Sequence, residues 1–278
     1  MSSYILNNID DDIDYITDES DVESDTERET PDMVDKYILK KRCAGGAFSS
    51  VYHGENVRTG APVAIKTEPV NSEVGLLRHE ARMYMYLRGS TSLFLPKWYG
   101  ISTRDLRCLV LPIGPPSLAL QSDTLSRMHI GARIALSDRI IGLLVEALGD
   151  LHARGVMHRD IKPANVLFDA DCEDPSRSLT IIDLGMATFL PHTRRPAALV
   201  GSPAFASLGA HACDPPVPAQ DMESAAYTAL YVREGGHVPW ITTSDVPQVA
   251  CAMSRGGAVA TVWRAAQTLN VDDNDSGL

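Results

Sequence analysis

The chain has 278 residues and a mass of 30.2 kDa, with 44% hydrophobic and 22% charged residues. A chain of this length can bury a sizeable core, and its composition excludes a largely disordered or fibrous protein. The net charge of −11 is concentrated at one end: residues 1–35 hold thirteen acids and one base, which leaves the remainder near +1. A broad basic face is therefore excluded, and we expect no direct binding of nucleic acid.

Cysteines and apolar runs bear on the compartment. The five cysteines are odd in number and far apart in the sequence, which speaks against a zinc site or a disulfide framework: Cys43, Cys108, Cys172, Cys213 and Cys251. No apolar run approaches the roughly 18 residues of a membrane-spanning helix. The acidic N-terminus does not resemble a signal peptide. We expect an intracellular protein, in cytoplasm or nucleus, without a membrane segment.

Residues 1–35 are predicted to form a disordered acidic tail. Eleven carboxylates between Asp10 and Glu29 alternate with serines and threonines, so the segment repels itself and has little apolar surface to bury. Two functions remain open for this tail. It is either a solubilising extension or a regulatory segment that carries phosphate.

The remaining chain, residues 36–278, is predicted as an α+β domain in two parts. Short β-rich runs and one amphipathic helix occupy about 36–111, and helix formers dominate from about 115 onward, with a hinge near 111–114. The predicted strands are 37–42, 50–56, 63–68, 98–101, 106–111, 166–168 and 179–182. The predicted helices are 74–88, 135–154, 221–233 and 247–269.

The strongest motif is the run HRDIKPAN at residues 158–165. Its residue types and spacing match the catalytic loop of protein kinases, so the chain resembles that family. The resemblance implies a bilobal kinase fold and phosphoryl transfer from ATP with Mg²⁺. It makes Asp160 the group that orients the acceptor hydroxyl, Lys162 a cation on the moving phosphate, and Asn165 a magnesium ligand.

Other kinase motifs follow in the expected order. The run VAIK ends at Lys66, which would pair with the phosphates, and Glu80 lies fourteen residues later as its natural carboxylate partner. The run DLG begins at Asp183, the second predicted magnesium ligand. Leu184 replaces the phenylalanine that is usual in this motif and keeps an apolar side chain there. The alternative is that Lys66 and Glu80 are simply exposed on the protein surface and do not form a pair.

The glycine-rich loop is the weakest match. Of the pattern G-x-G-x-x-G-x-V, aligned from residue 44 to 51, only Gly46 and Val51 match, so ATP affinity could be reduced. Val110 is predicted to guard the adenine pocket, beside Pro112 in the hinge. The predicted nucleotide-binding residues are Ala44, Gly45, Gly46, Ala47, Phe48, Ser49, Val51, Ala64, Lys66, Val110 and Ile113.

Three segments resemble the casein kinase 1 and vaccinia-related kinase group of Ser/Thr kinases. They are GSPAFAS at 201–207, DMES at 221–224 followed by Pro239–Trp240, and GPPSL at 114–118. Lys162 is the residue that Ser/Thr kinases carry at its position. In this group Asp221 is a structural brace for the catalytic loop. The short C-terminal part and the acidic tail favour a viral member of this group.

We therefore expect an ATP- and Mg²⁺-dependent kinase that phosphorylates protein Ser/Thr, favouring acidic or already phosphorylated sites. The C-terminally abbreviated domain could leave apolar surface near 262–269 uncovered, which predicts self-association or a protein partner there. Two alternatives stay open. One is a pseudokinase scaffold without turnover, favoured by the altered glycine loop. The other is a small-molecule kinase, which shares the two-lobed architecture.

Overall fold

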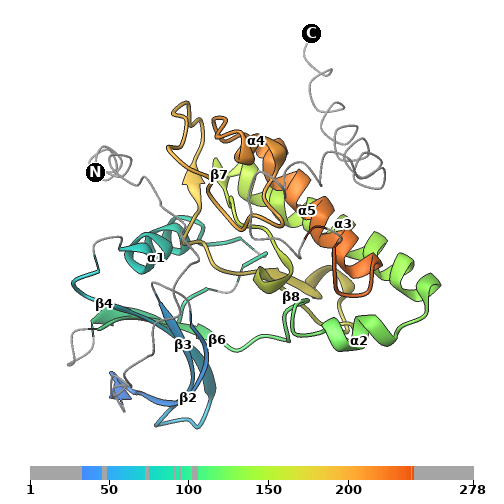
Figure 1. Ribbon diagram of the computed structural model, residues 1–278. Coiled ribbons are helices and arrows are strands. Elements are labelled where there is room, and N and C mark those ends of the chain that lie inside the picture. Colours follow the sequence, from blue (N-terminus) through green and yellow to red (C-terminus); the bar gives the residue numbers. More distant parts are fainter. Residues whose placement is uncertain are drawn as a thin grey trace.

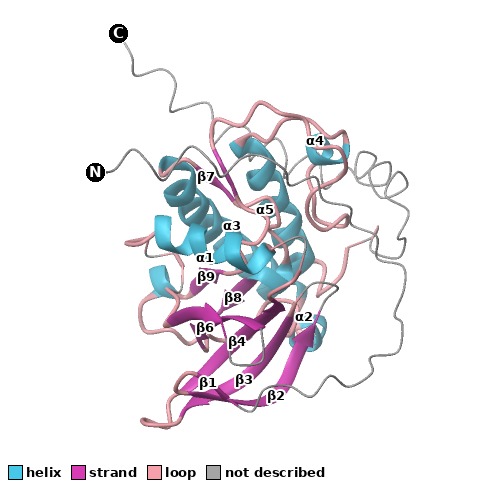
Figure 2. Ribbon diagram, turned by 90° about the vertical axis from the view of Figure 1, so that its left-hand side faces the viewer, coloured by secondary structure: helices cyan, strands magenta, loops and turns pink. Residues whose placement is uncertain are grey.

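The computed structural model describes residues 33–45, 49–72, 75–90, 92–93, 95–101, 106–238 and 240. Figures 1 and 2 show two parts, a twisted sheet with one helix and a larger region built mainly from helices. This is the order of β-rich and helical segments that the sequence predicts. Most of the predicted acidic tail and the predicted helix 247–269 lie outside the described residues.

A six-stranded antiparallel sheet forms the N-terminal part. Its spatial order is β1-β2-β3-β4-β6-β5. The strands are β1 (Met33–Val34), β2 (Tyr37–Gly45), β3 (Ser50–Asn56), β4 (Pro62–Pro69), β5 (Trp98–Ile101) and β6 (Leu106–Pro112). All five strands predicted for this part are confirmed, and β1 is additional.

Strand β1 corrects the predicted boundary of the tail. Met33 and Val34 pair with Ile38 and Tyr37 of β2, and Val34 is only 1% exposed. The turn between the two strands places Asp35 at φ 52°, a conformation that aspartate tolerates better than most residues. The folded domain thus begins by residue 33, because a buried valine joins the core of the sheet.

Helix α1 (Leu76–Tyr86) is the amphipathic helix predicted from the spacing of its apolar residues. It begins after Gly75, whose φ of 63° is accessible to glycine at little cost. Leu77, Met83 and Tyr84 are buried in the main core together with Leu109 of β6. The helix therefore packs on the sheet face that carries Leu109.

The second part contains the remaining elements. They are α2 (Ser122–Arg127), α3 (Ile130–Ala153), β7 (Val156–Met157), η1 (Pro163–Asn165), β8 (Val166–Phe168), η2 (Pro175–Arg177), β9 (Leu179–Ile181), β10 (Thr188–Phe189), α4 (Leu208–His211) and α5 (Pro218–Arg233). The predicted strands at 166–168 and 179–182 are confirmed as β8 and β9, which pair antiparallel. The short elements α2, β7, β10 and α4 were not predicted.

Helices α3 and α5 lie side by side and form the centre of this part (Figure 1). α3 starts five residues before the predicted position, where the His129 side chain accepts a hydrogen bond from the amide of Gly131. Ile140, Leu144 and Leu148 lie along its buried face. α5 is buried along almost its whole length, from Asp221 to Val232. No helix in the described part is both long and apolar enough to span a membrane.

Candidate active site

The charged residues predicted on β4, on α1 and after β9 lie together in the structure. Lys66 Nζ is 2.7 Å from Glu80 Oε2 and 2.8 Å from Asp183 Oδ1. The side chain of Glu80 is 1% exposed and that of Lys66 15%, whereas Asp183 keeps 38%. Because the three residues come from three separate elements, their ion pairs join α1 to the sheet and to the segment after β9.

Charge and burial compete in this cluster. Burial disfavours the charged lysine, but the two carboxylates outweigh it and raise the pKa of Lys66. Burial acts against ionised Asp183 as well, yet the adjacent ammonium lowers the pKa of Asp183 to about 2. Burial raises the pKa of Glu80, and Lys66 opposes that rise. At neutral pH the cluster therefore presents a lysine cation and an ionised, partly exposed Asp183.

A second group of polar side chains surrounds Asp160 in the loop after β7. Asn165 Nδ2 donates to the backbone oxygen of Asp160 at 2.9 Å and to its Oδ2 at 3.0 Å. Lys162 Nζ is 2.9 Å from the same carboxylate and donates to Ser202 Oγ at 2.6 Å. The backbone amide of Ser202 donates to Asp160 Oδ1 at 2.9 Å. The carboxylate is thus held in one orientation by the loop and by residues 201–207.

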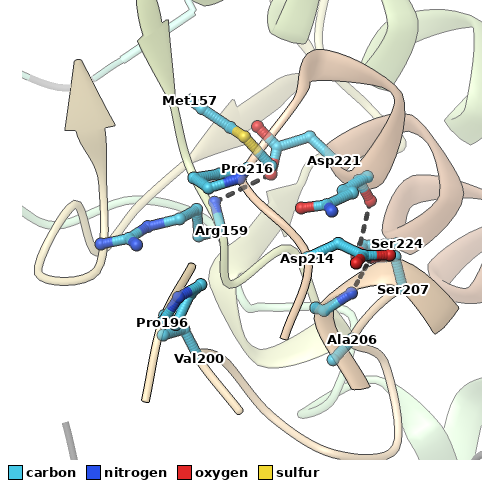
Figure 3. Close-up of a pocket in the computed structure, with 12 residues that line it drawn as sticks. Met157, Arg159, Pro196, Val200, Ala206, Ser207, Asp214, Pro216, Asp221 and Ser224 are labelled. Carbon is cyan, nitrogen blue, oxygen red and sulfur yellow. Dashed lines mark hydrogen bonds between the residues drawn. The ribbon is translucent and has the colours of Figure 1, made fainter. Parts of the chain in front are cut away.

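Asp221, predicted as a brace, reaches this loop from the buried start of α5 (Figure 3). Its carboxylate accepts hydrogen bonds from the amides of His158 at 2.7 Å and Arg159 at 2.8 Å. His152 Nε2 of α3 lies 2.9 Å away. Burial opposes the charge, but these bonds and nearby histidines lower the pKa of Asp221. The bonds also hold Arg159 at a φ of 65°, an uncommon conformation for a non-glycine residue.

The region beside Asp221 is too closely packed to bind a large ligand. The pocket of Figure 3, beside Asp221 and Arg159, has a volume of about 20 Å³. That is room for about one water molecule and far too little for a nucleotide. Gly201 has a φ of +97°, and a Cβ there would lie 2.4 Å from the backbone oxygen of Arg159. The chain before Ser202 therefore packs directly on the catalytic loop, which only glycine permits.

Asn165 and Asp183 are brought together by the β8–β9 pair. The amide of Ile182, next to Asp183, donates to the backbone oxygen of Asn165 at 3.0 Å. The hydrogen bonds of Asn165 to Asp160 use its side-chain nitrogen, so they do not occupy the amide oxygen. One carboxylate and one amide oxygen are the hard ligands that Mg²⁺ takes in phosphate-binding sites. These donors fit a magnesium ion.

The predicted nucleotide loop is described in part. Ala44 and Gly45 end β2 and pair with Val51 and Ser50 of β3. Gly46, Ala47 and Phe48 lie outside the described residues, and Ser49 precedes β3. Val51 is the cross-strand partner of Lys66, which pairs on its other side with Leu109. Directly paired residues share a sheet face, so Val51 lies on the face of Lys66.

The structure corrects the prediction for Val110. Val110 pairs with Ile65 and is buried with it in the cluster on the opposite face of the sheet. Leu111, one residue later, pairs with Ala64 and packs against the main core on the face of Lys66. Leu111 therefore shares the face of Lys66, and Val110, the predicted guard residue, does not. A shift of one residue in aligning GPPSL moves the side chain to the other face, because strand residues alternate. Ile113 follows β6 and is 40% exposed.

Three side chains that contact residues of the site were not predicted from the sequence. Ser202 was part of a noted segment, but its contact with Lys162 depends on the fold. His152 contacts Asp221 from α3 and has no sequence signal of its own. His79, which directly precedes Glu80, has its Nε2 2.6 Å from the backbone oxygen of Ala187. Ala187 lies four residues after Asp183. These contacts arise between elements distant in sequence, where no motif could show them.

A comparison with known families agrees with this geometry. Residues 37–208 match the family model described as the protein kinase domain. The match covers more than half of the chain, and it includes Lys66, Glu80, Asp160, Asn165 and Asp183.

Proposed function

Because this chain belongs to the protein kinase family, we propose that it transfers the γ-phosphate of ATP to serine and threonine hydroxyls of proteins. The observation that supports the proposal is the presence of two clusters of charged and polar side chains. Lys66 binds Glu80 and Asp183 in the first. Asp160, held by Asn165 and Lys162, forms the second. A lysine cation, an ionised metal ligand and an oriented carboxylate are the groups that phosphoryl transfer requires.

Each residue has a role that follows from its charge and position. Asp160 orients the acceptor hydroxyl and accepts its proton. Lys162, whose ammonium already binds the Ser202 hydroxyl, stabilises negative charge on the transferred group. Lys66 neutralises the α- and β-phosphates, and Glu80 keeps it in place. Leu184 is fully buried and anchors the segment that carries Asp183.

We assign the magnesium ligands to Asp183 and Asn165, in line with the fit of their oxygen atoms. Mg²⁺ bound there would neutralise charge on the phosphates during transfer. For the base of ATP we propose the sheet face that carries Val51, Ala64 and Leu111. The loop at 44–49 would cover the phosphates.

A preference for acidic or phosphorylated sites is the finer part of this proposal. Arg194 and Arg195 are exposed in the segment between β10 and α4. Arg195 reaches Asp214 at 3.1 Å, which ties this segment to the loop before α5. Guanidinium groups bind carboxylates and phosphates well. The acidic N-terminus, with Ser24 three residues after Asp21, is one candidate substrate.

We also propose that the chain belongs to the casein kinase 1 and vaccinia-related kinase group and is a viral member of it. Glu223 of the DMES run accepts bonds from the amide of Leu208 and from the Tyr227 hydroxyl, so the motif joins α4 to α5. Trp240 Nε1 donates to the backbone oxygen of Ala204 at 2.7 Å, which links the PW segment to GSPAFAS. The PW part of the second segment thus contacts the first, whereas GPPSL contacts β8, where the amide of Leu118 donates to the backbone oxygen of Val166. The predicted association near 262–269 concerns residues outside the described part.

A scaffold without turnover is the second candidate, and the observation that favours it is the loop with one glycine of the three. Purified protein with labelled ATP, Mg²⁺ and casein distinguishes the two. We expect phosphoserine and phosphothreonine on casein, and none above background for Asp160→Asn. Equal incorporation by the two proteins, with melting temperatures alike, would refute the kinase proposal.

A further inference from the structure

Helices α1 and α5 each carry a buried glutamate and a buried tyrosine four residues apart. The pairs are Glu80 with Tyr84 and Glu223 with Tyr227. Residues at this spacing lie on one face of a helix and can contact each other. In α5 they do: the Tyr227 hydroxyl donates to Glu223 Oε1 at 2.5 Å. This spacing therefore permits the bond.

In α1 the same pair is open. Glu80 uses Oε2 to bind Lys66, while its Oε1 is buried without a hydrogen-bond partner. The hydroxyl of Tyr84 is likewise buried and has no partner, and Tyr84 is 0% exposed. Buried polar atoms are paired in the great majority of cases. Two open atoms on one face of one helix therefore call for a partner that reaches both.

The backbone amides of Asp183 and Leu184 influence the pKa values of these two side chains. Burial raises the pKa of Tyr84, and the amide of Asp183 acts in the opposite sense, as a donor directed at the hydroxyl does. Burial also raises the pKa of Glu80, and the amide of Leu184 opposes that rise. Neither amide reaches hydrogen-bond geometry with these oxygens. A small closure of α1 onto this segment would complete the bonds.

A tyrosine hydroxyl can donate one hydrogen bond and accept another at the same time. We propose that Tyr84 is a positioning residue: in the nucleotide-loaded protein its hydroxyl donates to Glu80 Oε1 and accepts from the Asp183 amide. One hydroxyl then satisfies both open atoms and fixes the backbone that carries the Asp183 carboxylate. This inference rests on the proposed function, in which Asp183 holds Mg²⁺.

The test compares Tyr84→Phe with Tyr227→Phe, which removes the same atom from the matched pair. Thermal stability without nucleotide is measured first, followed by the Mg²⁺ concentration that gives half of the ADP-induced thermal shift. Tyr84→Phe should raise this concentration about tenfold, the scale of one hydrogen bond to a charged site. Its melting temperature without nucleotide should be unchanged or higher, since it loses a hydroxyl without a partner.

Tyr227→Phe should behave in the opposite way. It breaks an existing bond, so its melting temperature falls while its Mg²⁺ requirement stays that of the wild type. A third measurement follows hydrogen exchange of the amides at 183–185 with MgADP bound. These amides should be protected in the wild type and in Tyr227→Phe, and less protected in Tyr84→Phe.

The two levels of the proposal fail differently. If Tyr84→Phe matches the wild type in Mg²⁺ requirement and in exchange at 183–185, the tyrosine is a packing residue and this inference is wrong. Asp183→Asn tests the proposed function itself and should abolish the Mg²⁺-dependent part of the ADP-induced thermal shift. If it keeps that part in full, Asp183 is not the metal ligand and the function itself must be revised.

Discussion

Asp183 and Asp221 are two carboxylates close to the catalytic loop, and the fold holds them in different ways. Asp221 is 1% exposed and binds two consecutive backbone amides, those of His158 and Arg159. Asp183 keeps 38% exposure, and a lysine from the other lobe binds it. The carboxylate that fixes the loop is buried among backbone donors. The carboxylate proposed to bind a ligand is left open toward it.

The largest expected effect comes from breaking the Asp183 cluster at Lys66. Lys66→Met should lower turnover at least about a thousandfold, or about 4 kcal/mol in the barrier, because phosphate charge loses its partner. The melting temperature should change little, since burial already raises the pKa of Glu80 and lets it take up a proton. Steady-state kinetics and calorimetry measure the two. A variant with full turnover would remove Lys66 from the site.

Asp221→Asn should have the opposite profile, with the main effect on stability. The amide group can accept from one of the two backbone donors but presents its own N–H to the other. We expect a loss of about 2–4 kcal/mol in the free energy of unfolding, measured by urea titration. Turnover of the protein that remains folded should fall less than in Lys66→Met. Wild-type stability would show that the loop needs no brace.

The contribution of Asp221 to stability should depend on pH. The pKa of Asp221 is lower in the folded protein than its ordinary 3.8, so its contribution is present above that value and lost as pH falls through the folded pKa. The wild type should therefore lose stability below about pH 4, and its advantage over Asp221→Asn should shrink there. Urea titrations at several pH values test this. A constant gap down to pH 2 would contradict it.

The smallest expected effect concerns the predicted glycine loop, which contains neither carboxylate. Ser49→Gly should lower the KM for ATP about two- to threefold if the approach of backbone amides to phosphate is limiting. The kcat should stay the same, because Ser49 precedes β3 and lies outside the two charged clusters. An unchanged or higher KM would show that serine already fits there.

The charged residues of the site were predictable because they lie in contiguous motifs. Lys66, Glu80 and Asp183 meet as their spacing and strand positions indicate. The strands of the sheet also follow from alternation and turn residues. The prediction that failed depends on register: Val110 was chosen, but its neighbour Leu111 shares the sheet face of Lys66.

Other features had no local signal. Tyr84 fits the apolar stripe of α1, and nothing in the sequence distinguishes its open hydroxyl from the paired hydroxyl of Tyr227. The short elements β10 and α4 are too brief for a period and depend on tertiary contacts, such as the pairing of Thr188 with Met157. Val34 was assigned to the tail because a single apolar residue beside acids gives no strand pattern.

Helix α1 belongs to the N-terminal lobe by sequence and packs on its sheet, but it also contacts the other lobe near both of its ends. His79 contacts Ala187, Tyr86 donates to the backbone oxygen of Arg154 at 3.0 Å, and its ring packs edge-on against Phe189. A rotation of the lobes about the segment after Pro112 would therefore strain α1 from both sides. Either its contacts with the C-terminal lobe or its contacts with the sheet, the Lys66–Glu80 ion pair among them, would have to give way. Spin-label distances from Arg82 to each lobe would show which one it follows.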